Sequence, residues 1–294
     1  MKTTTHKRNW LFLLATILCV FVILFAIPAS AHAANGITTL KAGKTYKYAL
    51  TGATKHSIKY TVSSDAYGEN YKVNIYINGK LKKTVSADYG IGSSVKLLQI
   101  NNKTKLIYVE IYAENDYTQA QKVYRYSGGK LVLSGDLVKL SSKLGSFIPA
   151  SSGSNKLNVN LWSQTVSIGC YSSNTHLKYS KGALKRSTST VKVKFYEDKK
   201  IKSGEPSGWK NNWGTACRSF TAYTTAGGSK VSFKVKKKDR LQVLYAKLYK
   251  GKLYYQVKNA NGKKGWIKNY DSWKWNEKTD MHKCQYFYEA AYAG

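Results

Sequence analysis

The side chains best suited to covalent or acid–base chemistry are few and scattered in this sequence. After residue 33 the histidines are His56, His176 and His282, and each stands alone. Only 15 of 294 residues are Asp or Glu, and no close pair of them suggests glycoside hydrolysis. The motifs of serine hydrolases, zinc peptidases and phosphate-binding loops are missing. We therefore predict no catalytic residues and no enzyme activity.

The cysteines offer at most a structural role. Cys170, Cys217 and Cys284 follow residue 33, an odd number for an exported chain. The most favourable pairing is a disulfide between Cys217 and Cys284, and the alternative of three free thiols is equally open. Cys170 lies in an expected strand, where a cysteine usually packs as a small apolar side chain. No C-x-x-C spacing occurs, so we predict no metal site and no cofactor.

Aromatic side chains and lysines gather in the C-terminal third, and these residue types favour non-covalent binding. Aromatic faces suit sugar rings, and lysines attract anionic groups. Trp266 is one predicted contact, although it could equally belong to a core. The predicted ligand-binding residues are Tyr223, Tyr254, Trp266, Tyr270, Lys263, Lys264 and Lys268.

The net charge of the chain is strongly positive. The formal charge is +33 at pH 7, and residues 1–33 contribute three basic and no acidic residues, which leaves 33 − 3 = +30 for the rest. Such a field concentrates polyanions near the surface. Only Arg125, Arg186, Arg218 and Arg240 could give bidentate phosphate or base contacts there. We expect diffuse, salt-sensitive adhesion and no specific nucleic-acid binding, while many lysines simply solvate strand faces.

Residues 1–33 have the pattern of a secretory signal peptide. Lys2 and Lys7 precede an uncharged apolar run, and Pro28 and the Ala-His-Ala sequence that ends at Ala33 mark a cleavage site. Cleavage predicts an extracellular or wall-bound protein that keeps no membrane span. The alternative is an uncleaved anchor, since the apolar run approaches the roughly 20 residues that cross a bilayer.

Short strands must position the candidate contacts. Residues 231–268 show period-2 alternation, in which Leu241, Val243 and Tyr245 are expected to face the core. Asn261-Gly262 lies between two such runs and predicts a type I′ hairpin turn, which needs positive φ at both residues. Tyr, Val, Ser, Thr and Gly are abundant and no segment keeps a helical period. The composition therefore predicts an all-β fold.

The same stretch resembles the bacterial SH3-like (SH3b) domain. The resemblance is carried by residues 241–244, by 254–258 and by the Gly-Trp-Ile ending of 261–267. It implies a small β-barrel over residues 215–270 that usually binds cell-wall material and is not an enzyme, or that acts as a spacer. Residues 215–220 are similar to the active-site box of wall-cutting cysteine peptidases. They lack the Asp, Ser and Gly of that box, so no peptidase activity is expected.

Three hairpins recur at a period of about fifty residues. Their turn glycines are Gly79, Gly129 and Gly182, and further strand-like runs precede each hairpin. Four-stranded units at this spacing are typical of propeller blades, but three units are too few for a closed propeller. We expect an incomplete, propeller-like repeat domain of antiparallel sheets over residues 35–188.

These units resemble the integrin-type (FG-GAP or VCBS-like) repeats of secreted Firmicute proteins. In that family an acidic loop between the first two strands binds calcium. The corresponding loops, 50–58 and 100–107, contain no carboxylate, and hydroxyl, amide and lysine groups cannot hold a hard cation. The resemblance therefore implies repeats that have lost their metal.

A linker and a tail complete the predicted organisation. Residues 189–214 hold a leading strand and a loop with Trp209 and Trp213, which could bind ligand or close the open end of the barrel. Residues 271–294 are rich in aromatic side chains. We expect this tail to pack on the barrel, with residues 286–292 as a strand.

These observations predict a secreted, non-catalytic binding protein of the cell envelope. The SH3-like domain would contact glycan or peptide of the wall, while the basic surface is attracted to anionic polymer. The partner is then peptidoglycan or teichoic acid. The alternative is a structural or interaction module that binds another secreted protein.

Overall fold

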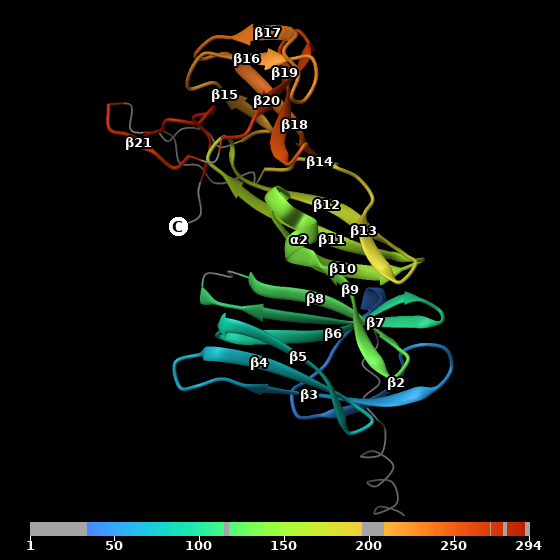
Figure 1. Cartoon of the computed structure of the whole chain (residues 1–294). Helices are drawn as coiled ribbons and strands as arrows, with labels where there is room; N and C mark the ends of the chain where they lie inside the picture. The colour runs from blue at the N-terminus through green and yellow to red at the C-terminus, as the bar shows by residue number, and fades with distance from the viewer. Residues whose placement is uncertain (1–33, 115–117, 196–208, 271, 279–280, 292–294) are drawn as a thin grey trace, which may run out of the picture. The chain divides into compact units, whose positions relative to one another are not determined.

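The chain folds almost entirely into β-strands. Figure 1 shows the computed structural model, which describes residues 34–114, 118–195, 209–270, 272–278 and 281–291. Of the described residues, 64% lie in strands and 5% in helices, and the strands form several antiparallel sheets, which confirms the all-β prediction. No helix within the described ranges is long and apolar enough to cross a membrane. The predicted signal peptide lies outside them.

Three sheets are built from consecutive antiparallel strands, except that β1 (Ile37–Thr39), which precedes the first sheet in sequence, pairs with β6 (Gly92–Asn101) of the second. The first has the order β2 (Thr45–Ala49), β3 (Lys55–Ser63), β4 (Glu69–Ile77), β5 (Lys80–Tyr89). The second has the order β1, β6, β7 (Thr104–Tyr112), β8 (Thr118–Ser127), β9 (Lys130–Asp136). The third has the order β10 (Ser146–Gly153), β11 (Lys156–Thr165), β12 (Gly169–Ser180), β13 (Ala183–Arg186). Short helices precede the first sheet and link the second to the third: η1 (Ala34–Gly36), α2 (Leu137–Ser141) and η3 (Ser142–Leu144).

The three hairpins expected from their glycines are present. They join β4 to β5, β8 to β9 and β12 to β13, so each connects the last two strands of its sheet. Gly79, Gly129 and Gly182 have φ of 75°, 75° and 80°, and the residue before each also has positive φ. Such pairs define two-residue turns that match the twist of the strands. The domain boundaries at 35–188 and 215–270 stay predictions.

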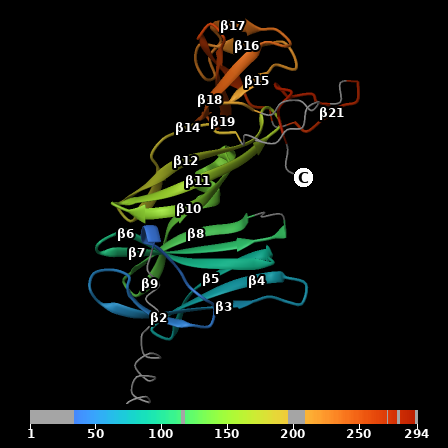
Figure 2. The same ribbon diagram turned by 180° about the vertical axis from the view of Figure 1, so that it is seen from behind.

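The second sheet is buried on both faces. In β7, Leu106 and Tyr108 belong to a core shared with the third sheet, whereas Ile107 and Val109 belong to a core shared with the first. Figures 1 and 2 show the second sheet between the other two. Burial on both sides explains why these four residues form a continuous apolar run instead of an alternating one.

The fourth sheet has seven strands in the order β14-β18-β19-β20-β16-β17, with β15 paired to β18. The segment predicted as a linker supplies two of them. None of the described sheets is closed on itself, so the expected barrel is not seen as a closed ring of strands. The strands are β14 (Thr190–Lys192), β15 (Trp213–Thr215), β16 (Phe220–Tyr223), β17 (Val231–Val235), β18 (Arg240–Tyr249), β19 (Lys252–Asn259) and β20 (Lys264–Lys268).

The inner face of the fourth sheet shares its core with the third sheet. The Tyr255 hydroxyl donates to Thr165 Oγ1 over 2.8 Å. Trp209 stacks on Phe195 with ring centroids 3.7 Å apart, and only 5% of its surface is exposed. Trp209 is therefore a core residue and not a binding aromatic.

The tail segment also contributes to this core, but not as a strand. Tyr286 and Phe287 are buried, and the Cys217 N–H donates to the Tyr286 carbonyl over 2.9 Å. The strand expected over 286–292 is wrong for the described part of that range, where only an isolated bridge between Phe287 and Ala216 occurs. The chain turns directly after it, because the Ala290 N–H donates back to the Phe287 carbonyl. A two-stranded hairpin precedes this segment: β21 (Trp275–Asn276) and β22 (Met281–His282).

The predicted turn at Asn261-Gly262 forms with a different geometry. Gly262 has φ of 79°, but Asn261 does not have positive φ, so the turn is not type I′. The Gly262 N–H donates to the Asn259 carbonyl, and the Asn259 N–H donates to the Lys263 carbonyl, each over 3.0 Å. A three-residue loop with its glycine in the left-handed region fits this pattern.

Candidate functional site

One face of the fourth sheet presents aromatic side chains and lysines to solvent. Side chains alternate along each strand, so the opposite face buries Tyr255, Val257 and Ile267 in the core. We call the outer surface the aromatic–lysine face. It comprises Tyr223, Tyr245, Lys247, Tyr249, Tyr254, Gln256, Lys258, Lys264, Trp266 and Lys268.

A row of four side chains crosses the middle of this face. Tyr245 pairs with Gln256, Gln256 pairs with Trp266, and Trp266 pairs with Tyr223, on β18, β19, β20 and β16. Residues directly opposite in antiparallel strands lie close enough for their side chains to touch. The row therefore has aromatic rings on both sides of the Gln256 amide group. Of these rings, that of Tyr245 belongs to a residue that is 39% exposed.

Lysine ammonium groups lie above the rings of this face. Lys247 Nζ is 5.5 Å from the ring centroid of Trp266 and 5.8 Å from that of Tyr249. Lys258 Nζ is 5.8 Å from the ring centroid of Trp213 at the neighbouring edge. A cation within about 6 Å of a ring centroid is attracted by the quadrupole of the ring. The face thus places positive charge beside stacking surface.

A β-bulge creates the exposed end of this face. The pairing of β18 with β19 shifts register between Val243 and Tyr245. One extra residue reverses the facing of every side chain that follows. Val243 is fully buried, whereas Tyr245, which the sequence placed in the core, points outward with Lys247 and Tyr249.

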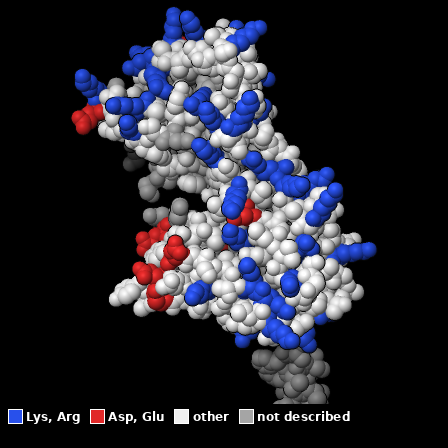
Figure 3. Space-filling model, viewed as in Figure 1, with Lys and Arg blue, Asp and Glu red and all other residues white. Residues whose placement is uncertain are grey.

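The charge of the face is not compensated by acids. Asp239 is the only acidic residue between positions 209 and 270, and its Oδ2 accepts the Lys236 N–H over 2.7 Å in the turn before β18. Within the described residues the one ion pair joins Lys122 to Asp136, in the second sheet. Figure 3 shows most acidic side chains of that view gathered at the lower left, with a few elsewhere, while Lys and Arg are spread widely. An anionic ligand would therefore meet no repulsion from acidic side chains on this face.

The structure brings most of the predicted ligand contacts together. Tyr223, Lys264, Trp266 and Lys268 lie on the face. Tyr254 lies there too but is only 9% exposed, so it can offer little contact area.

Two predicted contacts lie beside the face. Lys263 is exposed in the turn before β20, where its N–H donates to Asn259 Oδ1. Tyr270 follows the end of β20 and is 42% exposed, and Lys268 Nζ lies 5.1 Å from its ring centroid. The Tyr270 N–H donates to Ser167 Oγ over 3.0 Å, which ties this position to the third sheet.

Five contributors to the face were missed from the sequence, namely Tyr245, Lys247, Tyr249, Gln256 and Lys258, whereas Trp213 had been given as a possible contact. A signal for three of them exists, because Tyr245, Lys247 and Tyr249 alternate with Ala246 and Leu248 as an exposed set would. The bulge hides this signal when the alternation is counted from Leu241. Nothing in the sequence indicates that Trp213 lies beside Lys258.

Of the two alternatives for the cysteines, a Cys217–Cys284 disulfide and free thiols, the structure has the free thiols. Cys217 pairs through its backbone with Tyr286, and its thiol donates to the Gln285 carbonyl over 3.2 Å. The thiol of Cys217 is thus directed at a backbone oxygen and not at Cys284.

Cys217 also lacks the features of a nucleophile. Burial raises the pKa of its thiol, and this effect exceeds the lowering by the charges of Arg218 and Lys237. A thiol that stays protonated is a poor nucleophile. Among the described residues, no three His, Cys, Asp or Glu side chains lie together as metal ligands would.

No protein-family model, no curated protein and no solved structure matches this chain. What the aromatic–lysine face can do follows from its groups: rings that stack, an amide that donates and accepts hydrogen bonds, and ammonium groups that attract anions. These groups are suited to non-covalent binding.

Proposed function

We propose that the protein is a secreted, non-catalytic binding protein of the cell envelope, and that its aromatic–lysine face contacts wall glycan or peptide. The observation that supports this most is the row from Tyr245 to Tyr223 with Lys247 above Trp266. Aromatic rings bind the apolar faces of sugars, while the lysines attract anionic wall polymer such as teichoic acid.

The proposal includes the finer fold assignment. We propose that β15–β20 form an SH3-like domain and that the first three sheets are an incomplete, propeller-like repeat. The pairing of β16 with both β17 and β20 supports the first, since it brings distant strands of the segment together. The three sheets with hairpin turns at equivalent positions support the second.

The two kinds of group have separate roles in this proposal. The positive field of the whole chain raises the rate of encounter with an anionic wall, and it weakens as salt is added. The aromatic row supplies short-range contacts that persist once the ligand is bound. Loss of an aromatic ring should therefore mainly raise the dissociation rate constant, and loss of charge should mainly lower the association rate constant.

The experiment is sedimentation of the purified protein with Gram-positive wall sacculi, with and without teichoic acid. Trp266→Ala should weaken binding about tenfold, which corresponds to about 1.4 kcal/mol. The matched control is Trp162→Ala, because Trp162 is a more exposed tryptophan, 46% exposed, that lies on the third sheet. That control should bind like the unaltered protein.

The stripped sacculi separate the contributions. Binding that falls when teichoic acid is removed supports the charge contribution, and binding that remains but is lost in Trp266→Ala supports the aromatic contribution. If the protein does not sediment with either preparation, the wall proposal is wrong. A search for a secreted protein partner would then follow.

A further inference from the structure

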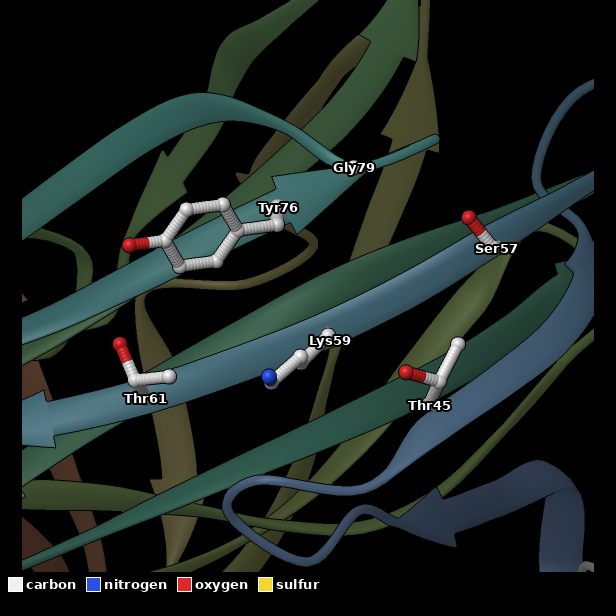
Figure 4. A pocket seen from close by; sticks show the side chains of 6 residues that line it. All are labelled: Thr45, Ser57, Lys59, Thr61, Tyr76 and Gly79. Atoms are coloured by element: carbon white, nitrogen blue, oxygen red, sulfur yellow. The ribbon is translucent and has the colours of Figure 1, made fainter.

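A polar pocket lies on the outer face of the first sheet, far in sequence from the aromatic–lysine face. Its volume is about 390 Å³, and Figure 4 shows its side chains on one side of the strands. The lining residues are Thr45, Ser57, Lys59, Thr61, Tyr76 and Gly79. A volume near 400 Å³ falls at the lower end of the range for small-molecule sites.

Strand register explains why these side chains converge. Lys59 on β3 pairs with Thr45 on β2 and with Tyr76 on β4. Ser57 and Thr61 lie two residues to either side of Lys59 and therefore share its face. Figure 4 shows Lys59 between Thr61 and Thr45, so one ammonium group is surrounded by hydroxyl groups.

The polar groups of this pocket are largely uncommitted. Among the described residues, no hydrogen bond or ion pair engages Lys59 Nζ or the hydroxyls of Thr45, Thr61 and Tyr76. Ser57 Oγ makes only a long contact of 3.5 Å with Asn78 Oδ1. Gly79, with φ of 75°, turns the chain at one end without adding a side chain.

We propose that this pocket binds a polyhydroxylated unit that carries one negative charge. Lys59 would pair with the anionic group, and the surrounding hydroxyls would exchange hydrogen bonds with the hydroxyls of the ligand. The Tyr76 ring offers the one aromatic surface for the C–H groups of a sugar or polyol. No acidic side chain lines the pocket, so the anion meets no repulsion there.

This chemistry fits two kinds of ligand, a polyol phosphate and an acidic sugar. The site is separate from the aromatic–lysine face and does not depend on its function. A chain with both sites would hold one polymer at two points or two polymers at once, and such linkage raises overall affinity without new contacts.

The test is titration of the full-length protein with sn-glycerol 3-phosphate, glucuronate, glucose and inorganic phosphate, followed by amide chemical shifts. We expect glycerol 3-phosphate or glucuronate to shift residues of β2, β3 and β4. Lys59→Met should weaken that binding at least about tenfold, since a charge-assisted hydrogen bond is lost. Lys59→Arg keeps the charge and should retain most of the affinity.

Two matched controls separate this pocket from general charge and from the other site. Lys72→Met removes an exposed lysine on the same sheet outside the pocket, and Trp266→Ala alters the aromatic–lysine face. Both should leave binding of the small probes unchanged.

Selective binding of glycerol 3-phosphate identifies a phosphate ligand, and selective binding of glucuronate identifies an acidic sugar. The proposal is overturned if neither probe binds, or if Lys59→Met binds as well as the unaltered protein. Equal affinity for glucose and glucuronate would remove the role of charge. Equal affinity for inorganic phosphate and glycerol 3-phosphate would remove the role of the hydroxyls.

Discussion

The side chain of Lys247 contributes to both parts of the proposed wall site, the positive charge and the aromatic stacking surface. Its Nζ lies within 6 Å of the ring centroids of both Trp266 and Tyr249, so its charge is held beside the stacking surface. Lysine side chains often lay their apolar stem along a surface while the charged head stays in water. A lysine in this position should contribute more to binding than a lysine that adds only to the general positive field of the chain.

We therefore predict that Lys247→Gln weakens binding to sacculi more than Lys178→Gln. Both substitutions remove one charge, but Lys178 is exposed on β12, and no ring of the described residues lies beneath its ammonium group. The expected loss for Lys247→Gln is about threefold to tenfold, the range of one cation–π or charge contact. Equal effects of the two variants, measured by sedimentation at one salt concentration, would contradict this assignment.

Tyr171 makes stability depend on pH in alkaline solution. Burial raises the pKa of this hydroxyl to about 12, and the hydroxyl donates to the Leu144 carbonyl over 3.1 Å. Below about pH 10 the hydroxyl is protonated in both the folded and the unfolded chain, and its contribution is complete. Above that pH the unfolded chain loses the proton first, so stability falls until the folded form also ionises near pH 12.

Tyr171→Phe should reduce this alkaline loss of stability by on the order of 2 kcal/mol between pH 10 and 12. The measurement is urea unfolding at pH 8, 10 and 11.5. Tyr67→Phe is the control, because Tyr67 is 84% exposed, and its unfolding should follow the unaltered protein. An identical pH dependence in Tyr171→Phe would show that burial of this hydroxyl is unimportant.

At the scale of elements, two register shifts in the fourth sheet decide which of its side chains face solvent. The bulge in β18 turns Tyr245 outward, and a second shift between Ala222 and Tyr223 accompanies the exposure of Val231. Simple alternation from Phe233 and Val235 would place Val231 inside and Ser232 outside, but Val231 is exposed and Ser232 is buried. Period-2 arguments are correct only up to the first bulge.

The tail segment yields a prediction about stability. Phe287 is fully buried and contacts Trp209 at 5.0 Å between ring centroids. Phe287→Ala should lower the free energy of unfolding by about 3–5 kcal/mol, the usual cost of removing a buried aromatic ring. Tyr288→Ala, at a neighbouring position that is 37% exposed, should cost far less. If Phe287→Ala and the unaltered protein had equal midpoints in urea unfolding, the segment would not stabilise the fold.

Much of the fold could be predicted because it depends on local signals. The strands and the hairpins at Gly79, Gly129 and Gly182 follow from alternation and from turn chemistry that acts within a few residues. Contacts between distant residues left no such signal. The burial of Trp209 beneath Phe195 and the approach of Lys258 to Trp213 depend on how sheets and segments meet.

At the scale of the whole molecule, the net charge predicts a strong effect of salt. A charge of +30 outside residues 1–33 attracts an anionic wall over about 10 Å at 0.1 M salt but only about 3 Å at 1 M. Sedimentation with teichoic-acid-containing sacculi should therefore fall several-fold between these concentrations. The fraction that survives should depend on Trp266, so Trp266→Ala should remove it. Binding that does not change with salt would contradict the role of charge.

The two core clusters differ in how far along the chain they reach. The core between the first and second sheets draws its residues from Leu40 to Leu131, mostly from neighbouring hairpins. The other core joins Leu98 to Phe287. Contacts between close neighbours in sequence form fastest, because little chain entropy is lost in closing short loops. When the chain emerges from export with its N-terminal part first, the first core can therefore assemble while the second waits for Phe287, so the N-terminal sheets would act as a template on which the later part of the chain folds.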